Sequence, residues 1–337
     1  MRIEATLEEW RDLYDIAIKL KEMKPWEELW DMDLITILPH EKDEPCICSV
    51  MGKGGEYYGI GVYIGIQAIQ NFFVISNNED IPSHQLMRYQ NNILCNFGSR
   101  DELTKKERDI IKELGLKFRG KNNWIYFRVF EKGYASYMPN RSEVLELTDI
   151  LGHLYMAIKA LRDGLKVDFE GGKTLMRRFS EEDNLWVNYE MPVFIPEIKY
   201  PIPTLEDELL VKRLKKKGTD NSILELDIAY LNLTINEKGY DKPLITRLCV
   251  LVDTRSGVLL SQIMVKPEDD EIDVVFGIII NHILQKGKPK RIIVRDGYIF
   301  SILMDLCKKI GIEVLISQKL IGIDEFIESL YEHMLQH

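Results

Sequence analysis

The chain has 337 residues, of which 45% are hydrophobic, and it carries a formal charge of −10. This length is enough for two ordinary domains, each with a core of its own. The acidic balance does not favour nucleic-acid binding, because a phosphate backbone is gripped mainly by Lys and Arg. The five cysteines are scattered without a CxxC pair, which favours reduced thiols and a cytoplasmic location.

The first half of the chain predicts a mixed α+β domain. Thr6 and Glu9 form a capping box that begins an amphipathic helix. Apolar runs at Cys46 to Met51 and Tyr57 to Ile64 flank a glycine-rich turn, which predicts a hairpin. Further along, Ser142 is placed to cap a long helix.

The middle of the chain contains a linker. Four prolines lie close together there, and proline is rejected by helix interiors and central strands: Pro192, Pro196, Pro201 and Pro203. We therefore expect an α+β domain of unknown function over 1–190, a Pro-rich linker and basic helix over 191–219, and a second domain over 220–337. The basic helix could contact nucleic acid or simply end in solvent. Neither a secretory signal nor a membrane span is expected, because the apolar runs are far shorter than the roughly 20 residues that cross a bilayer.

The second domain predicts three strands, a helix, a strand, a helix, a strand and a helix. The first three strands follow one another through short connections, so they should be antiparallel, whereas strands separated by helices should be parallel. This order, βββαβαβα, predicts an α/β domain with a mixed five-stranded sheet. The expected ranges are Ile223 to Leu233, Leu244 to Asp253, Val258 to Val265, Glu271 to Gln285, Arg291 to Arg295, Ile299 to Ile310, Glu313 to Ile316 and Ile323 to Leu335.

Four stretches of this domain resemble the catalytic core of retroviral-type integrases and related transposases, which belong to the ribonuclease-H-like superfamily. They are LELDIAYL, RLCVLVDTRSGVLL, IIVRDGYIFSILMDLCKKIGIEVL and IDEFIESLYEHM. The resemblance implies that Asp227, Asp296 and Glu328 are catalytic acids that bind two Mg²⁺ or Mn²⁺ ions, for which carboxylate oxygens are suitable ligands. Glu325 or Glu332 could take the place of Glu328.

Two functional hypotheses follow from these observations. The chain passes directly from Ser317 into the last helix, without the flexible loop of the integrase family, which favours a degenerate domain. The whole chain also resembles an uncharacterised bacterial family of two-domain proteins, through the Met-Gly-x-Gly-Gly-Glu turn at 51–56. The first hypothesis is a cytoplasmic, non-catalytic binding or scaffold protein with an unknown protein partner and no cofactor. The alternative is a Mg- or Mn-dependent nuclease or strand-transfer enzyme that uses Asp227, Asp296 and Glu328.

Overall fold

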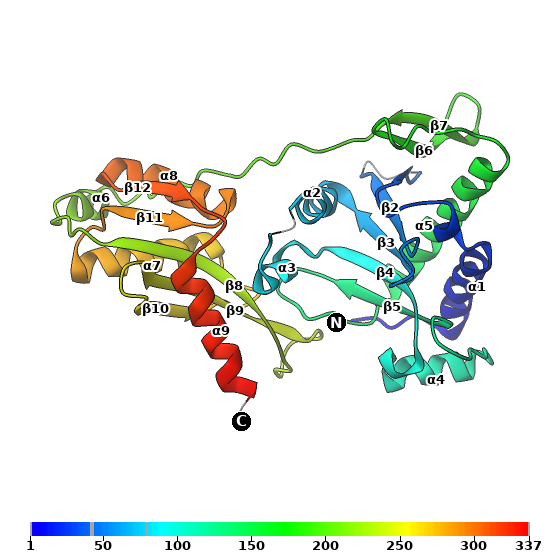
Figure 1. Cartoon of the computed structure of the whole chain (residues 1–337), viewed down its shortest axis with the longest axis horizontal. Helices are drawn as coiled ribbons and strands as arrows, with labels where there is room; N and C mark the ends of the chain where they lie inside the picture. The colour runs from blue at the N-terminus through cyan, green and yellow to red at the C-terminus, as the bar shows by residue number, and fades with distance from the viewer. Residues whose placement is uncertain (1, 41–43, 79, 336–337) are drawn as a thin grey trace. The chain divides into compact units, whose positions relative to one another are not determined.

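The computed structural model of the chain describes residues 2–40, 44–78 and 80–335, and it divides into two compact units (Figure 1). The first unit consists of Met1–Asn77, Tyr89–Lys132 and Ser136–Glu197. The second consists of Asn78–Arg88, Gly133–Ala135 and Ile198–His337. The second unit therefore includes a short segment, Asn78–Arg88, that comes from the amino-terminal half of the sequence.

The first unit is built on a seven-stranded sheet with the order β5-β4-β3-β2-β1-β6-β7. Strands β1 and β6 pair in parallel and the other neighbours are antiparallel. The predicted hairpin is confirmed, because β2 and β3 pair directly. The elements are α1 (Leu7–Met23), β1 (Ile35–Leu38), β2 (Cys46–Met51), β3 (Gly59–Ile64), α2 (Gly65–Ser76), β4 (Asn92–Gly98), α4 (Lys105–Glu113), β5 (Trp124–Phe130), α5 (Arg141–Arg162), β6 (Lys173–Ser180) and β7 (Leu185–Pro192), with 3-10 turns at Pro25–Glu27 and Arg100–Glu102.

Helices α1 and α5 of this unit begin at capping residues, one of which corrects the sequence analysis. Thr6 caps α1 as predicted, since its hydroxyl accepts a hydrogen bond from Glu9 N at 3.2 Å. The cap of α5, however, is Asn140 and not Ser142. The backbone of Asn140 is extended, so its side-chain oxygen can accept the N–H of Glu143, and the Ser142 hydroxyl donates to that same oxygen.

The second unit contains a mixed five-stranded sheet with the order β10-β9-β8-β11-β12. Strands β8, β9 and β10 are antiparallel neighbours, and β11 pairs in parallel with both β8 and β12. The predicted mixture of antiparallel and parallel pairs is confirmed. No helix among the described residues is both long and apolar enough to cross a membrane. The elements are α3 (Ser83–Tyr89), α6 (Glu208–Lys215), β8 (Ile223–Ile235), β9 (Leu244–Asp253), β10 (Leu259–Met264), α7 (Glu271–Lys286), β11 (Arg291–Val294), α8 (Gly297–Ile310), β12 (Glu313–Ile316) and α9 (Ile321–Leu335).

The two faces of β8 are chemically different. Side chains alternate between the faces of a strand, so Leu224, Leu226 and Ile228 lie in the core formed with α6, α7 and α8. Ala229, from the alternate set, belongs to the smaller core formed with α9. Two acids precede Ala229 in this set, at positions 225 and 227. The face of the sheet that α9 covers therefore carries buried carboxylates as well as apolar side chains.

Candidate functional site

Asp227 and Asp296 both lie near the carboxyl end of β11. Strands β8 and β11 are parallel, and their register pairs Leu226 with Val294. The next residues along the chain are Asp227, within β8, and Arg295, directly after β11, so these two side chains are neighbours at the carboxyl end of β11. Asp296 follows immediately and caps α8, since its Oδ1 accepts a hydrogen bond from Ile299 N at 2.9 Å.

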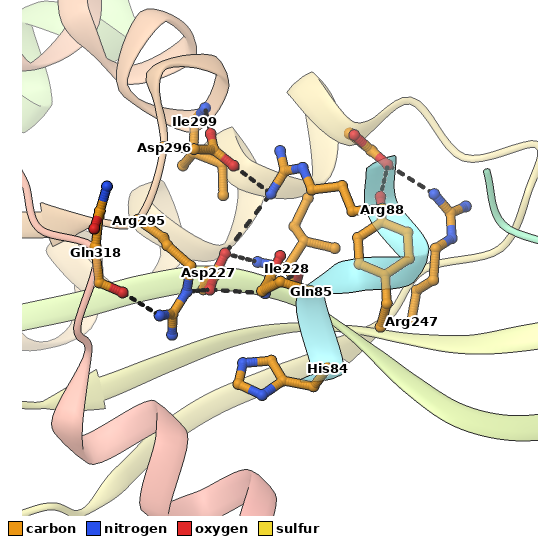
Figure 2. A network of polar contacts seen from close by, with 12 residues as sticks. His84, Gln85, Arg88, Asp227, Ile228, Arg247, Arg295, Asp296, Ile299 and Gln318 are labelled. Atoms are coloured by element: carbon orange, nitrogen blue, oxygen red, sulfur yellow. Dashed lines mark hydrogen bonds and ion pairs between the residues drawn. The ribbon is translucent and has the colours of Figure 1, made fainter. Parts of the chain in front are cut away.

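Asp227 is completely buried, and its carboxylate is saturated by protein donors (Figure 2). Oδ2 accepts hydrogen bonds from Arg295 Nε at 2.7 Å and from Gln85 Nε2 at 2.9 Å. Oδ1 accepts the N–H of Ile228 at 2.8 Å and lies 3.8 Å from Arg88 Nη1. A carboxylate has about four lone-pair directions, so these contacts leave little room for another ligand. Burial raises the pKa of Asp227, and the two arginines oppose that rise.

Helix α3 delivers two of these partners from a distant part of the sequence. Gln85 and Arg88 are three residues apart, so they lie on the same face of the helix. Arg88 is buried, and its Nη1 lies 2.5 Å from Asp296 Oδ2. Its guanidinium also lies 5.5 Å from the centre of the Tyr298 ring, within the range of a cation–π contact. Arg88 thus stands between the two acids that the sequence analysis selected.

Arg295 links Asp227 to the last helix. Its Nη2 donates to Asp324 Oδ1 at 2.5 Å, and its Nη1 donates to the carbonyl of Gln318. Burial by itself lowers the pKa of the Arg295 guanidinium, but the carboxylates of Asp227 and Asp324 outweigh this and raise it. Arginine stays protonated in proteins, so the contact is a permanent charge-assisted link. It connects β8, β11 and α9.

Glu328 does not join this network. It is exposed on α9, one turn beyond Asp324, and no hydrogen bond or ion pair connects it to Asp227 or Asp296 among the residues described. Within the same residues no group of three His, Cys, Asp or Glu side chains could hold a metal ion. The acids that the structure does bring together face guanidinium groups, so this donor set does not fit Mg²⁺ or Mn²⁺. Metal binding by Asp227, Asp296 and Glu328 stays a prediction.

A second buried ion pair, drawn in Figure 2, lies on the face of the sheet that packs against α7 and α8, since Arg247 is paired in register with Tyr230 of that core. Arg247 Nη1 donates to Glu271 Oε1 at 2.7 Å, and both side chains are almost fully buried. The hydroxyl of Tyr230 donates to the same oxygen at 3.3 Å. Arg247 Nη2 also donates to the carbonyl of Lys266. This pair connects β9 to the start of α7.

A cleft opens beside the Asp227 network, between α3 and α9. We call it the α3–α9 cleft. It is lined by Asp80, Pro82, Ser83, His84, Gln318, Lys319, Ile321, Asp324, Glu325, Ile327, Glu328 and Tyr331. His84 is buried, and its Nε2 lies 3.4 Å from Asp324 Oδ1. Burial lowers the pKa of His84 to about 4; Arg295 acts in the same direction, and Asp324 opposes both.

The imidazole of His84 should therefore stay neutral down to about pH 5. The folded pKa of about 4 is below the value of about 6.5 for an unperturbed histidine, so the unfolded chain binds more protons between these pH values. The contribution of neutral His84 to stability is fully present above about pH 6.5 and is lost as the pH falls toward 4. An NMR titration of the histidine ring signals, assigned with His84→Gln, measures the pKa directly. A midpoint near 6.5 would contradict the buried position of the ring.

Part of this site was not foreseen from the sequence. The sequence analysis named Asp227 and Asp296, and it named Arg295 only as the last residue of an expected strand. It gave no role to Gln85 or Arg88, because a short helix between two stretches of the first unit carries no pattern that indicates its packing partner. A buried strand acid such as Asp227 does indicate that a cationic or hydrogen-bonding partner must exist.

Comparisons with known proteins agree with two domains and define no activity. Residues 10–177 match a family described as Domain of unknown function (DUF7309), and residues 210–331 match Domain of unknown function (DUF6930). No curated protein matches the chain.

Solved structures similar to the chain include catalytic cores of retroviral integrases. The HTLV-2 integrase catalytic core domain in complex with magnesium is 22% identical, with a TM-score of 0.25, over 36% of this chain and 75% of that one. A simian T-cell lymphotropic virus intasome in complex with the PP2A regulatory subunit B56 gamma is 20% identical, with a TM-score of 0.25, over 37% of this chain and 45% of that one. The catalytic core domain of BIV integrase is 18% identical, with a TM-score of 0.24, over 34% of this chain and 66% of that one. At these TM-scores the similarity assigns no ligand or reaction to this chain.

Proposed function

We propose that the second unit is a degenerate ribonuclease-H-like domain, and that the chain is a non-catalytic binding or scaffold protein. One observation carries the proposal: Asp227 and Asp296 are both held by guanidinium groups, from Arg295 and Arg88. At an effective dielectric near 20, opposite unit charges 4 Å apart attract by about 4 kcal/mol before solvation costs. A metal ion bound to both acids would have to displace Arg295 from Asp227 and Arg88 from Asp296, and both guanidinium groups are buried.

The proposal extends to the organisation of the chain. It keeps the domains 1–190 and 220–337 with the linker 191–219, and it adds residues 78–88 to the second domain because they supply Gln85 and Arg88. The βββαβαβα order is interpreted as the ribonuclease-H-like arrangement. The proposal also includes a bacterial cytoplasm and a protein partner. Nucleic acid is a less suitable partner, since the net charge of −10 repels a phosphate backbone.

A manganese titration tests the proposal against the nuclease alternative. We expect no saturable binding of Mn²⁺ at millimolar concentration when free Mn²⁺ is measured by electron paramagnetic resonance. We also expect no metal-dependent cleavage of single- or double-stranded DNA or RNA. A metal ion at 100 times its dissociation constant would stabilise the fold by about 2.7 kcal/mol, so thermal unfolding gives an independent measurement.

The control for this titration is a pair of matched variants on α8. Asp296→Asn removes one charge and keeps a side chain that can cap the helix. Asp305→Asn removes one charge from the same helix outside the network, where Asp305 pairs with Lys309. Saturable Mn²⁺ binding that Asp296→Asn abolishes and Asp305→Asn preserves would overturn the proposal and favour the nuclease alternative with Asp227, Asp296 and Glu328.

A further inference from the structure

The α3–α9 cleft presents carboxylates that have no partner among the described residues. Asp80, Glu325 and Glu328 line it, and none of the three forms a hydrogen bond or ion pair with another residue in the described part of the chain. Asp324, also in the cleft, is held by Arg295. One lysine, Lys319, stands against these four acids among the described residues that line the cleft. The local charge therefore suits a cationic ligand.

A buried side chain gives a second and independent indication of a ligand. His84 is 6% exposed and lines the cleft, and in the described structure its Nε2 makes no hydrogen bond. Figure 2 shows its ring extending from α3 away from Asp296. Asp324 Oδ1 lies 3.4 Å from Nε2. Buried polar atoms are nearly always hydrogen-bonded, so an atom without a partner beside a cleft is a position where a ligand can complete the bonding.

The cleft also has apolar and aromatic surface next to the acids. Ile321 is 66% exposed, Ile327 is buried below it, and Tyr331 lies on the same helix. A cationic side chain with a long apolar stem matches this combination. Arginine matches better than lysine, since its planar guanidinium has five donors, binds carboxylates in a bidentate manner and stacks on aromatic rings.

We propose that the α3–α9 cleft binds an arginine side chain of a partner protein. The guanidinium pairs with Glu328 and Glu325, donates to Nε2 of His84, and rests its stem against Ile321 and Tyr331. This inference rests on the proposed function, because it names the class of partner that a non-catalytic domain would bind. The arginines already in the network hold α3 and α9 in place, so the cleft exists before the partner arrives.

Fluorescence anisotropy with a labelled hexa-arginine peptide tests the inference on the full chain. Glu325→Gln/Glu328→Gln is the test variant, because both side chains are exposed and unpaired within the described residues. The double change removes both ion pairs with the guanidinium, so it should weaken binding about tenfold. The signal of His84 in the NMR spectrum should shift when the peptide is added to the wild-type protein.

A matched variant separates the cleft from the general negative charge. Glu181→Gln/Glu182→Gln removes the same charge from an exposed turn of the first unit and should leave the affinity unchanged. Equal weakening by both variants, equal affinity for hexalysine, or no binding of hexa-arginine would overturn the inference. The two tests depend on different side chains, because the manganese titration is decided at Asp296, which does not line the cleft, and the peptide titration at Glu325 and Glu328. Failure of the peptide test would leave the proposed function standing. Manganese binding that Asp296→Asn abolishes would overturn the proposed function.

Discussion

Replacing Arg295 with methionine should destabilise the second unit by about 3–5 kcal/mol, the usual cost of removing one partner of a buried ion pair. The change leaves Asp227 fully buried with one guanidinium fewer, and it frees Asp324 from its contact with β11. Methionine keeps the apolar volume of the side chain, so the loss of stability reflects mainly the missing charge. The free energy of unfolding, from urea denaturation followed by far-UV circular dichroism, is the quantity to compare.

A nearby arginine provides the matched control for this change. Arg291 begins β11, the strand that Arg295 follows, and pairs with Glu313 at 2.6 Å, but its side chain is 31% exposed. Arg291→Met should therefore cost less than about 1 kcal/mol, as is usual for exposed pairs. The double variant Arg295→Met/Asp227→Asn should cost less than the sum of its two single changes. Equal small losses for Arg291→Met and Arg295→Met would show that the network around Asp227 does not hold the unit together.

Replacing Glu271 with alanine should have an effect of similar size, about 3–5 kcal/mol. It leaves the buried guanidinium of Arg247 without its counter-ion, and it removes the acceptor of the Tyr230 hydroxyl. Glu208→Ala is the matched control, since Glu208 is 84% exposed in its pair with Lys212. Urea denaturation again gives the free energies. A Glu271→Ala variant as stable as the wild type would mean that water or another side chain replaces the carboxylate.

The tryptophans allow the two units to be followed separately in these experiments. All five lie in the first unit: Trp10, Trp26, Trp30, Trp124 and Trp186. Tryptophan fluorescence therefore reports on the first unit, whereas circular dichroism reports on both. A change at Arg295 or Glu271 should shift the circular dichroism transition. A two-unit chain need not unfold in a single step, so the two signals are compared before any free energy is assigned.

The site shows where sequence patterns stop being informative. Asp227 and Asp296 could be selected because each follows from a local rule: a polar residue inside an apolar strand, and an acid that begins a helix after a strand. Glu328 was placed by resemblance, and the structure puts Asp324, one turn earlier, in contact with Arg295. The last helix carries three acids spaced by one turn, Asp324, Glu328 and Glu332. They share one face of the helix, so their spacing does not indicate which of them reaches the sheet.

The sequence by itself determined the mixed character of both units, the hairpin at β2 and β3, and the alternation of strands and helices in the second unit. These features depend on periodicity and capping, which are local. Only the tertiary structure decided that Arg88 and Gln85 meet Asp227, which lies about 140 residues further along the chain. The reason is physical: a buried charge needs a partner of opposite charge, but any part of the chain can supply it, and only the folded packing selects which one does.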